Sequence, residues 1–481
     1  MNSENKFDVL LTYPKENINA FYYMIPLGIA GIAAVLEQNG FSVKVIDFNF
    51  YHHDFRRYLK KWSPKIIGIG GTTGTRNGSF KTAKICKEIL PDVPVVYGGP
   101  HATFTAEDTL QNIKEIDFIV KNEGEFPFLN MAEKFVRNKN IFLKNIYGIS
   151  YRKEAEILHN PVTRIENLDI LPLPARHLFE GKYKIKLDYL GLDADFLITS
   201  RGCPFSCDFC SAARMFPGGI SFRSMEHIQK EIDFILSKKK IKALKIFDST
   251  FTASKKHVID FCRMIKPYNL FWECEVRADT VDLNLLKTMK EAGCSYIDIG
   301  LETTDRKILD SINKKISVRQ VENVIGWCRE IGIKIKVFFT FGHLDQTYQS
   351  CLNDVSYIKR NKDKIDFFAT TVGMRIYPGT SLFTKAKSSG LIPQDFSWVK
   401  FKAPPWKFLL FEFENQFILN QKQLNYWKLL FIVIKLVSNG TVGSIGFIKE
   451  LLVINCHKLA KQFGIRFKFL YHIIRRKVRG L

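Results

Sequence analysis

Two series of short apolar segments, each followed by an amphipathic helical pattern, limit the folds open to this chain of 481 residues. The apolar segments of the first series span residues 7–11, 41–48, 65–71, 93–99 and 116–120. Helical patterns such as residues 27–40 separate them. Because short buried strands that alternate with helices form doubly wound parallel sheets, we expect a Rossmann-like domain over residues 1–139.

The second series predicts another parallel sheet. Its apolar segments span residues 195–200, 243–248, 271–277, 295–302, 335–342 and 367–378, again with helical patterns between them. Six strand–helix units in succession predict a (β/α)6 partial TIM barrel over residues 195–399. Residues 140–194 show little periodicity and are expected to form a connector. Residues 400–481 are expected to form a helical, basic C-terminal region, so the predicted fold class is α/β with two main domains.

The loops that follow the strands of the first series carry small and acidic residues. Ligands of doubly wound sheets bind beyond these carboxyl ends. The candidate binding residues at this edge are Gly71, Thr72, Thr73, Gly98, Gly99, Glu123 and Gly124. Glycine loops occur in many proteins, so the loops alone do not identify the ligand.

Three cysteines directly follow the first strand of the second series. Cys203, Cys207 and Cys210 form a C-x3-C-x2-C pattern on a predicted loop, where their thiolates can converge on one metal centre. A four-iron cluster takes four ligands, so three cysteines leave one iron open to a substrate or cofactor. A structural zinc site needs a fourth cysteine or histidine, and none lies nearby in the sequence. We therefore expect an iron–sulfur cluster.

This cysteine segment resembles the signature of the radical S-adenosylmethionine (SAM) superfamily, in which an aromatic residue, here Phe209, precedes the last cysteine. Residues 7–136 resemble the cobalamin-binding domain that precedes the barrel in class B members of this superfamily. The matching pieces are IPLGIAGIAAVLEQNGFSVKVID, GGPHAT and NEGE, and the connector sequence LPLPAR resembles that of the same group. The order of these pieces is more specific than any one of them.

The resemblance implies that the three cysteines bind a [4Fe-4S] cluster. An electron from the cluster would cleave SAM to a 5′-deoxyadenosyl radical. The backbone around Phe209 is expected to contact the adenine of SAM. Asp248 is expected near the amino group of its methionine moiety, Arg277 near the carboxylate and Glu302 near the ribose.

The same resemblance implies that cobalamin binds at the loop edge of the first domain. The D-x-H-x-x-G sequence, which supplies an axial histidine in many cobalamin domains, is absent from residues 1–140, as it commonly is in class B. The alternative is a doubly wound domain that binds another ligand or none.

The C-terminal end carries a large positive charge. Residues 401–481 contain 14 basic and 3 acidic residues, and residues 458–481 contain eight basic residues and no acidic one. The latter segment predicts either a helix in a phospholipid interface or an amphipathic helix packed on the barrel. Nucleic acid is not an expected partner, because no RNA-binding signature is present. Since no secretory signal or long apolar run is visible, we expect a cytoplasmic protein with at most peripheral contact at the inner membrane face.

The leading hypothesis is a cobalamin-dependent radical enzyme that methylates an unactivated carbon of a hydrophobic or natural-product substrate. A small molecule, including a lipid, would be the substrate, and a reducing protein such as flavodoxin or ferredoxin would supply electrons. One alternative is a non-methylating radical cyclisation or rearrangement, as in anaerobic porphyrin cyclases. Another is a non-catalytic sensor of metal or cobalamin.

Overall fold

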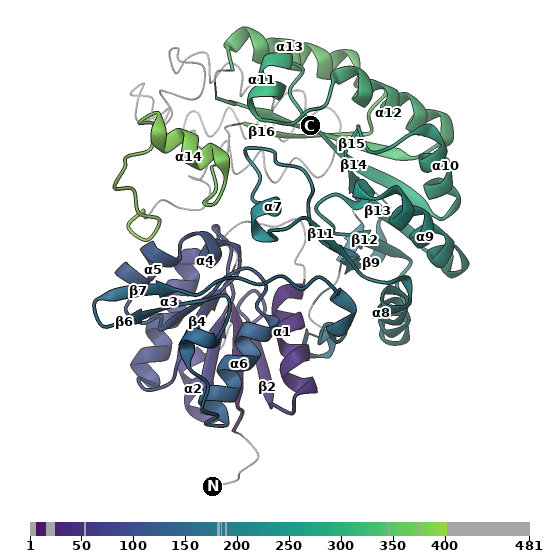
Figure 1. Cartoon of the computed structure of the whole chain (residues 1–481). Helices are drawn as coiled ribbons and strands as arrows, with labels where there is room; N and C mark the ends of the chain where they lie inside the picture. The colour runs from purple at the N-terminus through teal and green to yellow at the C-terminus, as the bar shows by residue number, and fades with distance from the viewer. Residues whose placement is uncertain are drawn as a thin grey trace, which may run out of the picture.

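The computed structural model describes residues 6–15, 25–51, 54–179, 183, 185–187, 190–344, 346–372 and 376–401. Within these residues two seven-stranded sheets form the centres of two domains that lie against each other (Figure 1). No helix in this part of the chain is long and apolar enough to cross a membrane. The basic segment 458–481, and all but the first two residues of the predicted C-terminal region, lie outside the described residues.

The first sheet is doubly wound, as predicted. Its strands are β1 (Val9–Tyr13), β2 (Val43–Asp47), β3 (Ile66–Ile69), β4 (Val95–Gly98), β5 (Phe118–Val120), β6 (Ile149–Lys153) and β7 (Glu156–His159). They lie in the order β2-β1-β3-β4-β5-β6-β7, and the first five are parallel. One face packs on α1 (Leu27–Gln38) and α6 (Glu125–Val136). The other packs on α2 (Phe55–Trp62), α3 (Arg76–Ile89), α4 (Pro100–Phe104) and α5 (Ala106–Asn112).

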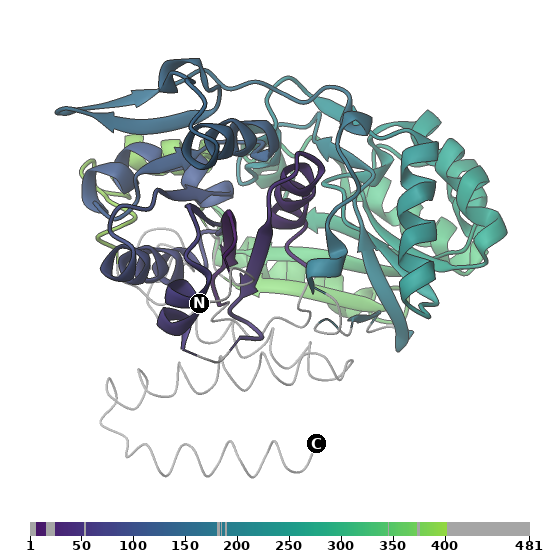
Figure 2. The same ribbon diagram turned by 90° about the horizontal axis from the view of Figure 1, so that it is seen from below.

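The first sheet extends further along the chain than the apolar pattern indicates. Strands β6 and β7 form an antiparallel hairpin that pairs with β5, inside the segment expected to be only a connector. The hairpin extends from the edge of the domain (Figure 2). Its strands are short and partly exposed, so they lack the continuous apolar run that marks a buried parallel strand. The boundaries proposed at residues 139, 194 and 399 stay predictions.

The second sheet is the predicted open, curled partial barrel. Its strands are β8 (Ile185–Leu187), β9 (Leu192–Leu197), β12 (Ala243–Ile246), β13 (Phe271–Val276), β14 (Cys294–Glu302), β15 (Lys334–Phe341) and β16 (Phe367–Val372). The order is β16-β15-β14-β13-β12-β9-β8, and all pairs except β8–β9 are parallel. Six parallel strands thus confirm the (β/α)6 prediction.

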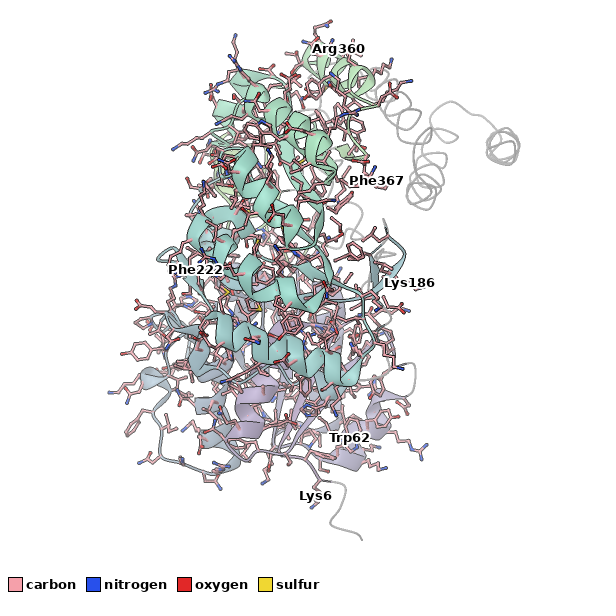
Figure 3. The ribbon with its side chains drawn as sticks, turned by 90° about the vertical axis from the view of Figure 1, so that its right-hand side faces the viewer. Lys6, Trp62, Lys186, Phe222, Arg360 and Phe367 are labelled. Atoms are coloured by element: carbon pink, nitrogen blue, oxygen red, sulfur yellow. The ribbon has the colours of Figure 1, made fainter. Side chains whose placement is uncertain are left out.

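Helices cover the outer face of this sheet and stack in a row along the molecule, from the side of Phe222 towards Arg360 (Figure 3). They are α8 (Met225–Lys238), α9 (Lys255–Ile265), α10 (Leu283–Glu291), α11 (Arg306–Ser311), α12 (Val318–Ile331) and α13 (Tyr348–Arg360), and α14 (Ser381–Ser388) follows the last strand. In each of these seven helices, a side-chain oxygen of the residue before the first turn accepts a backbone N–H bond; these residues are Ser224, Ser254, Asp282, Asp305, Ser317, Thr347 and Thr380. These caps explain why each helix begins soon after a strand ends.

A two-stranded sheet lies between the first barrel strand and its helix. It pairs β10 (Ser200–Gly202) with β11 (Ile220–Phe222), and it encloses the cysteine loop and the short helix α7 (Ala212–Met215). The segment with the cysteine loop therefore begins and ends on this small two-stranded sheet at the carboxyl end of β9.

The connector is anchored to the barrel by a buried arginine. In LPLPAR, the guanidinium of Arg176 donates to Glu231 at 2.6 Å, to Asp195 at 3.0 Å and to the carbonyl of Phe196 at 2.6 Å. All three side chains are almost fully buried. Because a buried charge is tolerated only when it is well paired, this cluster fixes the path of the connector between the domains.

Gly99, in the loop after β4, is required by a close backbone approach. Its φ is +101°, and a Cβ at this position would lie 2.5 Å from the carbonyl oxygen of Gly71 in the neighbouring loop. Only glycine combines this backbone conformation with such a contact. The two loops therefore meet without side chains between them.

We expect Gly99→Ala to destabilise the protein by about 2 kcal/mol, because the added methyl group meets backbone and the residue keeps a strained φ. The matched control is Gly326→Ala in the exposed middle of α12, where a Cβ meets nothing within 4 Å. That change should stabilise the helix by about 1 kcal/mol. Urea denaturation of both variants measures the difference, and equal effects would contradict the close-approach explanation.

Candidate active site

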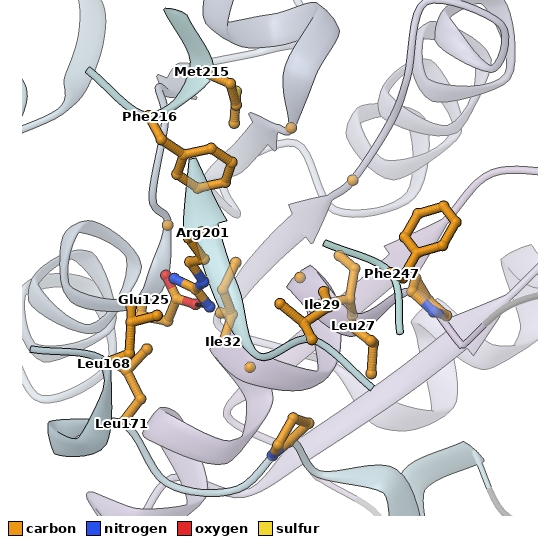
Figure 4. A pocket seen from close by; sticks show the side chains of 18 of the residues that line it. Leu27, Ile29, Ile32, Glu125, Leu168, Leu171, Arg201, Met215, Phe216 and Phe247 are labelled. Carbon is orange, nitrogen blue, oxygen red and sulfur yellow. Dashed lines mark hydrogen bonds and ion pairs between the residues drawn. The ribbon is translucent and has the colours of Figure 1, made fainter. Parts of the chain in front are cut away.

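The carboxyl ends of the two parallel sheets open onto a shared cavity of about 420 Å³. It is lined by loops that follow β3, β4 and β5 of the first sheet and by loops that follow β9 and β12 of the second. We call it the interdomain cavity (Figure 4). A second cavity of about 300 Å³, the barrel cavity, lies inside the second sheet. Ser249, directly after Asp248, lines both.

Several glycines of the loops after β3, β4 and β5 line the interdomain cavity. A Cβ on Gly70 would lie 2.8 Å from Ile29, one on Gly71 2.6 Å from Ser79, and one on Gly124 2.8 Å from Ile32. These short distances show that the glycines make room for side chains of the domain itself. They also leave parts of the cavity wall as backbone without a side chain, which fits the close approach of a large, flat ligand such as a corrin ring.

The predicted cobalamin contacts divide into two groups. Gly71, Thr72, Gly99 and Gly124 line the interdomain cavity, whereas Thr73, Gly98 and Glu123 are not among its lining residues. Thr73 is buried instead, with its hydroxyl 3.1 Å from Nδ1 of His101. Glu123 forms an ion pair with Arg201, with 2.8 Å between Oε1 and Nη1. These two side chains are therefore engaged by other residues of the protein and do not form part of the cavity wall.

The remaining wall of the interdomain cavity is mostly apolar and was not predicted from the glycine loops. Leu27, Ile29 and Ile32 come from α1, Leu168 and Leu171 from the connector, and Met215, Phe216 and Phe247 from the second domain (Figure 4). The first two turns of α1 belong to the sequence piece that carries the family resemblance. That piece therefore forms part of the ligand wall as well as the core.

The three cysteines line the barrel cavity together. Cys210 is exposed, and Cys203 and Cys207 are partly buried. Burial raises the pKa of the Cys207 thiol, and Lys314 and Arg277 oppose this shift. Burial also raises the pKa of Cys210, which the backbone N–H of Ala212 opposes and the other two thiols reinforce. The thiols are thus close enough to interact and lie beside positive charge.

No set of three cysteine, histidine or acidic side chains in the described residues is already gathered around a single-ion position. The cysteines of a [4Fe-4S] cluster bind three different irons, so they stand farther apart than the ligands of one ion. Three thiols around one cavity, with cations beside them to stabilise thiolates, fit such a cluster. The donor set also leaves the fourth iron for another ligand.

Arg277 directly follows β13 beside the cysteines, but its guanidinium is already engaged. It makes a two-point ion pair with Asp279 at 3.0 and 2.9 Å and lies 3.8 Å from the centre of the Phe205 ring. Its Nη1 also contacts Cys207 Sγ at 3.5 Å. The arginine is therefore held against the cysteine loop. The expected contact with the SAM carboxylate stays a prediction.

Glu302 is aimed into the barrel cavity by a local irregularity of β14. The pairing with β15 shifts register between Gly300 and Glu302, and Glu302 has a φ of +71°. Such bulges re-aim side chains at functional sites. The carboxylate accepts from Lys314 at 3.1 Å and from Thr340 at 3.0 Å. A Cβ on Gly300 would lie 2.6 Å from it, so the glycine makes room for this group.

Asp248 does not face either cavity. Its carboxylate accepts hydrogen bonds from the backbone and hydroxyl of Thr199, at 2.7 and 2.6 Å, and from the hydroxyl of Ser200 at 2.6 Å. These bonds hold Asp248 against the residues that lead into the cysteine loop, and its expected place near the amino group of SAM stays a prediction. Phe209, by contrast, lines the barrel cavity, and the expected contact of its backbone with the adenine of SAM stays a prediction.

Glu275 is a cavity residue that the motifs did not reveal. It lines the barrel cavity from β13, level with Asp298 of β14. Nearby acidic groups are paired, Glu273 with Lys245 at 2.7 Å and Asp298 with Lys336 at 2.8 Å. Glu275 makes no hydrogen bond or ion pair with any residue that the structure describes. Burial, reinforced by Asp298, raises its pKa to about 7.

The comparisons with known proteins agree with this geometry. Residues 197–358 match the family model of the radical SAM superfamily, and residues 17–132 match that of the B12 binding domain. The chain is 32% identical over 383 residues to an uncharacterized methyltransferase of Pyrococcus horikoshii, an alignment that covers 78% of this chain and 81% of the relative. The fold and the cysteine-lined site define a radical SAM enzyme joined to a corrinoid domain.

Two further matches extend the comparison. The chain is 25% identical to the anaerobic magnesium-protoporphyrin IX monomethyl ester cyclase of Rubrivivax gelatinosus, over 68% of this chain and 60% of the relative. The fold resembles that of the radical SAM methyltransferase TsrM of Kitasatospora setae with cobalamin and a [4Fe-4S] cluster bound, with a TM-score of 0.67 and 18% identity over 84% of this chain and 85% of that one. The chain belongs to the radical SAM superfamily, in the group with a B12-binding domain. Its cofactors are a [4Fe-4S] cluster, SAM and cobalamin.

The unpaired carboxyl of Glu275 predicts a pH dependence of stability. Its pKa in the folded protein lies above the ordinary value of 4.5, so the folded state holds the proton more tightly than the unfolded state. The free energy of unfolding should therefore fall by about 3 kcal/mol as pH rises from about 4.5 through about 7. Glu275→Gln should remove this decrease and be more stable at pH 8.

Urea denaturation between pH 5 and pH 8 measures this effect. Glu166→Gln, at an exposed position, is the matched control and should keep the wild-type pH profile. Parallel profiles for wild type and Glu275→Gln would show that the carboxyl does not titrate as the structure indicates.

Proposed function

We propose that the protein is a cobalamin-dependent methyltransferase that adds a methyl group to an unactivated carbon of a small-molecule substrate. The observation that carries this proposal is that Ser249 lines both cavities, so the two cavities adjoin at this residue. A substrate bound beside Ser249 would be within reach of both the corrinoid site and the SAM site. Bound together, the three cofactors supply one-electron chemistry and methyl transfer.

In this proposal the chain positions the cofactors and stabilises the negative charge of the cluster ligands. Cys203, Cys207 and Cys210 hold the cluster, and Arg277 and Lys314 stabilise the thiolate of Cys207. Glu302 orients the ribose of SAM as a hydrogen-bond acceptor. The loops that contain Gly71, Thr72, Gly99 and Gly124 would hold the corrinoid.

The walls of the site support a hydrophobic or natural-product substrate. The interdomain cavity is mostly apolar, and Phe247 at its edge is 41% exposed. Burial of apolar substrate surface there would expel water from the reacting region. A reducing protein such as flavodoxin or ferredoxin would supply the electrons. Lipid contact through residues 458–481 is a further expectation, but these residues are not described.

The similarity to the porphyrin ester cyclase supports one alternative, a radical reaction without methyl transfer. The two proposals differ in the product, because methylation adds one carbon and cyclisation adds none. They share the cluster and the cleavage of SAM.

The test follows isotope from the methyl group of labelled SAM into small molecules of an anaerobic cell extract, with reduced, cluster- and cobalamin-loaded enzyme. We expect the label in a new low-molecular-weight product, together with 5′-deoxyadenosine. Cys207→Ala should lose bound iron and at least a hundredfold in both products. Cys262→Ala, which changes a buried core thiol, should keep both. Deoxyadenosine without transferred label would favour the non-methylating alternative.

A further inference from the structure

A cluster of ion pairs joins the two domains at the residue that leads into the cysteine loop. Arg201, on β10, lies two residues before Cys203. It donates to Glu123 at 2.8 Å and to Glu125 at 2.6 Å, and these two carboxylates are only 5% and 4% exposed. Both glutamates belong to the loop and helix start after β5 of the first domain. We call Arg201, Glu123 and Glu125 the clamp.

The clamp is part of a closed ring of hydrogen bonds. The second oxygen of Glu123 accepts from the backbone N–H of Ile165 at 2.7 Å, and the Ile165 carbonyl accepts from the hydroxyl of Ser221 at 3.0 Å. Ser221 pairs with Arg201 across the β10–β11 ladder. Arg164 adds a bond of 2.7 Å to the same hydroxyl. Three segments far apart in the sequence are thus fixed to one another.

The same loop of the first domain also holds the far side of the cysteine loop. Nδ2 of Asn122 donates to the carbonyl of Met215 at 2.7 Å, with a longer contact of 3.4 Å to that of Arg214. These residues end α7, which follows Cys210. Residues 122–125 therefore contact the chain both before and after the three cysteines.

The clamp also forms part of the interdomain cavity. Arg201 and Glu125 lie side by side in its wall (Figure 4). A Cβ on Gly31 of α1 would lie 3.1 Å from Glu125, so the helix that carries the apolar wall rests on the clamp. A ligand in this cavity therefore touches the groups that hold the cysteine loop.

We propose that the clamp couples the two cofactor sites, so that a corrinoid in the interdomain cavity tightens the binding of SAM in the barrel cavity, and SAM tightens the binding of the corrinoid. This coupling requires that the protein binds both a corrinoid and SAM, and it does not depend on whether the reaction is a methyl transfer. A corrinoid would pack against Arg201 and Glu125, and SAM would bind at the cluster held by the cysteine loop that Arg201 leads into. Each ligand would therefore restrict the motion of the same clamped segments, so the second ligand has less motion left to restrict and binds more tightly.

The experiment measures the dissociation constant of labelled SAM by anaerobic equilibrium dialysis, with and without saturating hydroxocobalamin. The protein is cluster-loaded, and the cluster is kept oxidised so that SAM is not consumed. We expect the corrinoid to lower the dissociation constant about fivefold or more in the wild type. In Arg201→Lys, which keeps a charge but loses the planar fork that reaches both glutamates, the ratio should approach one.

Arg152→Lys is the matched control. Arg152 donates to the carbonyls of Leu110 at 2.9 Å and Ile113 at 2.7 Å, so all its partners lie in the first domain. This variant should keep the wild-type ratio. Glu125→Gln is a second clamp variant, used if Arg201→Lys does not fold. It weakens the clamp without leaving an unpaired buried carboxylate, and its ratio should also fall.

Two results would overturn the proposal. One is an equal affinity for SAM with and without corrinoid in the wild type. The other is a wild-type ratio in a folded clamp variant that still binds both ligands. Because the readout is binding, a failure of methyl transfer would leave the coupling intact, so the two proposals can fail separately.

Discussion

The facing carboxyl edges of two parallel sheets are the constraint on which the rest of the structure depends. A parallel sheet directs all its following loops to one edge, and ligands collect there. The two edges meet, so the glycine loops of the first domain and the cysteine loop of the second share one region. The order β2-β1-β3-β4-β5 places the loop after β3, with Gly70 and Gly71, at the point where the strand order reverses.

Charge pairing keeps this region in place. Arg176 ties the connector to the barrel, and Arg201 ties the cysteine loop to the first domain. Inside the barrel, Lys245 and Lys336 neutralise Glu273 and Asp298, and Glu275 keeps a free carboxyl towards the cavity. Buried pairs of this kind add little net stability, but loss of one partner is costly. They fix geometry more than they stabilise the fold.

The sequence predicts what local pattern determines. Apolar periodicity indicated both sheets, and three closely spaced cysteines are brought to one cavity by their loop alone. The sequence does not reveal which side chains from distant segments pair with one another in the fold. Asp248 is engaged by Thr199 and Ser200, and Glu123 is turned away by Arg201. Glu275 belongs to no motif. Its environment is formed by four strands that meet only in the folded barrel, so no local sequence pattern reveals it.

The central claim is that one chain holds a corrinoid and an iron–sulfur cluster at adjoining sites. Iron, sulfide and corrinoid should be quantified in a single sample of anaerobically purified protein that has been reconstituted with cluster and supplied with cobalamin. We expect about four irons and about one corrinoid per chain. Four irons without corrinoid would contradict the claim, and they would leave the glycine loops of the first domain to another ligand.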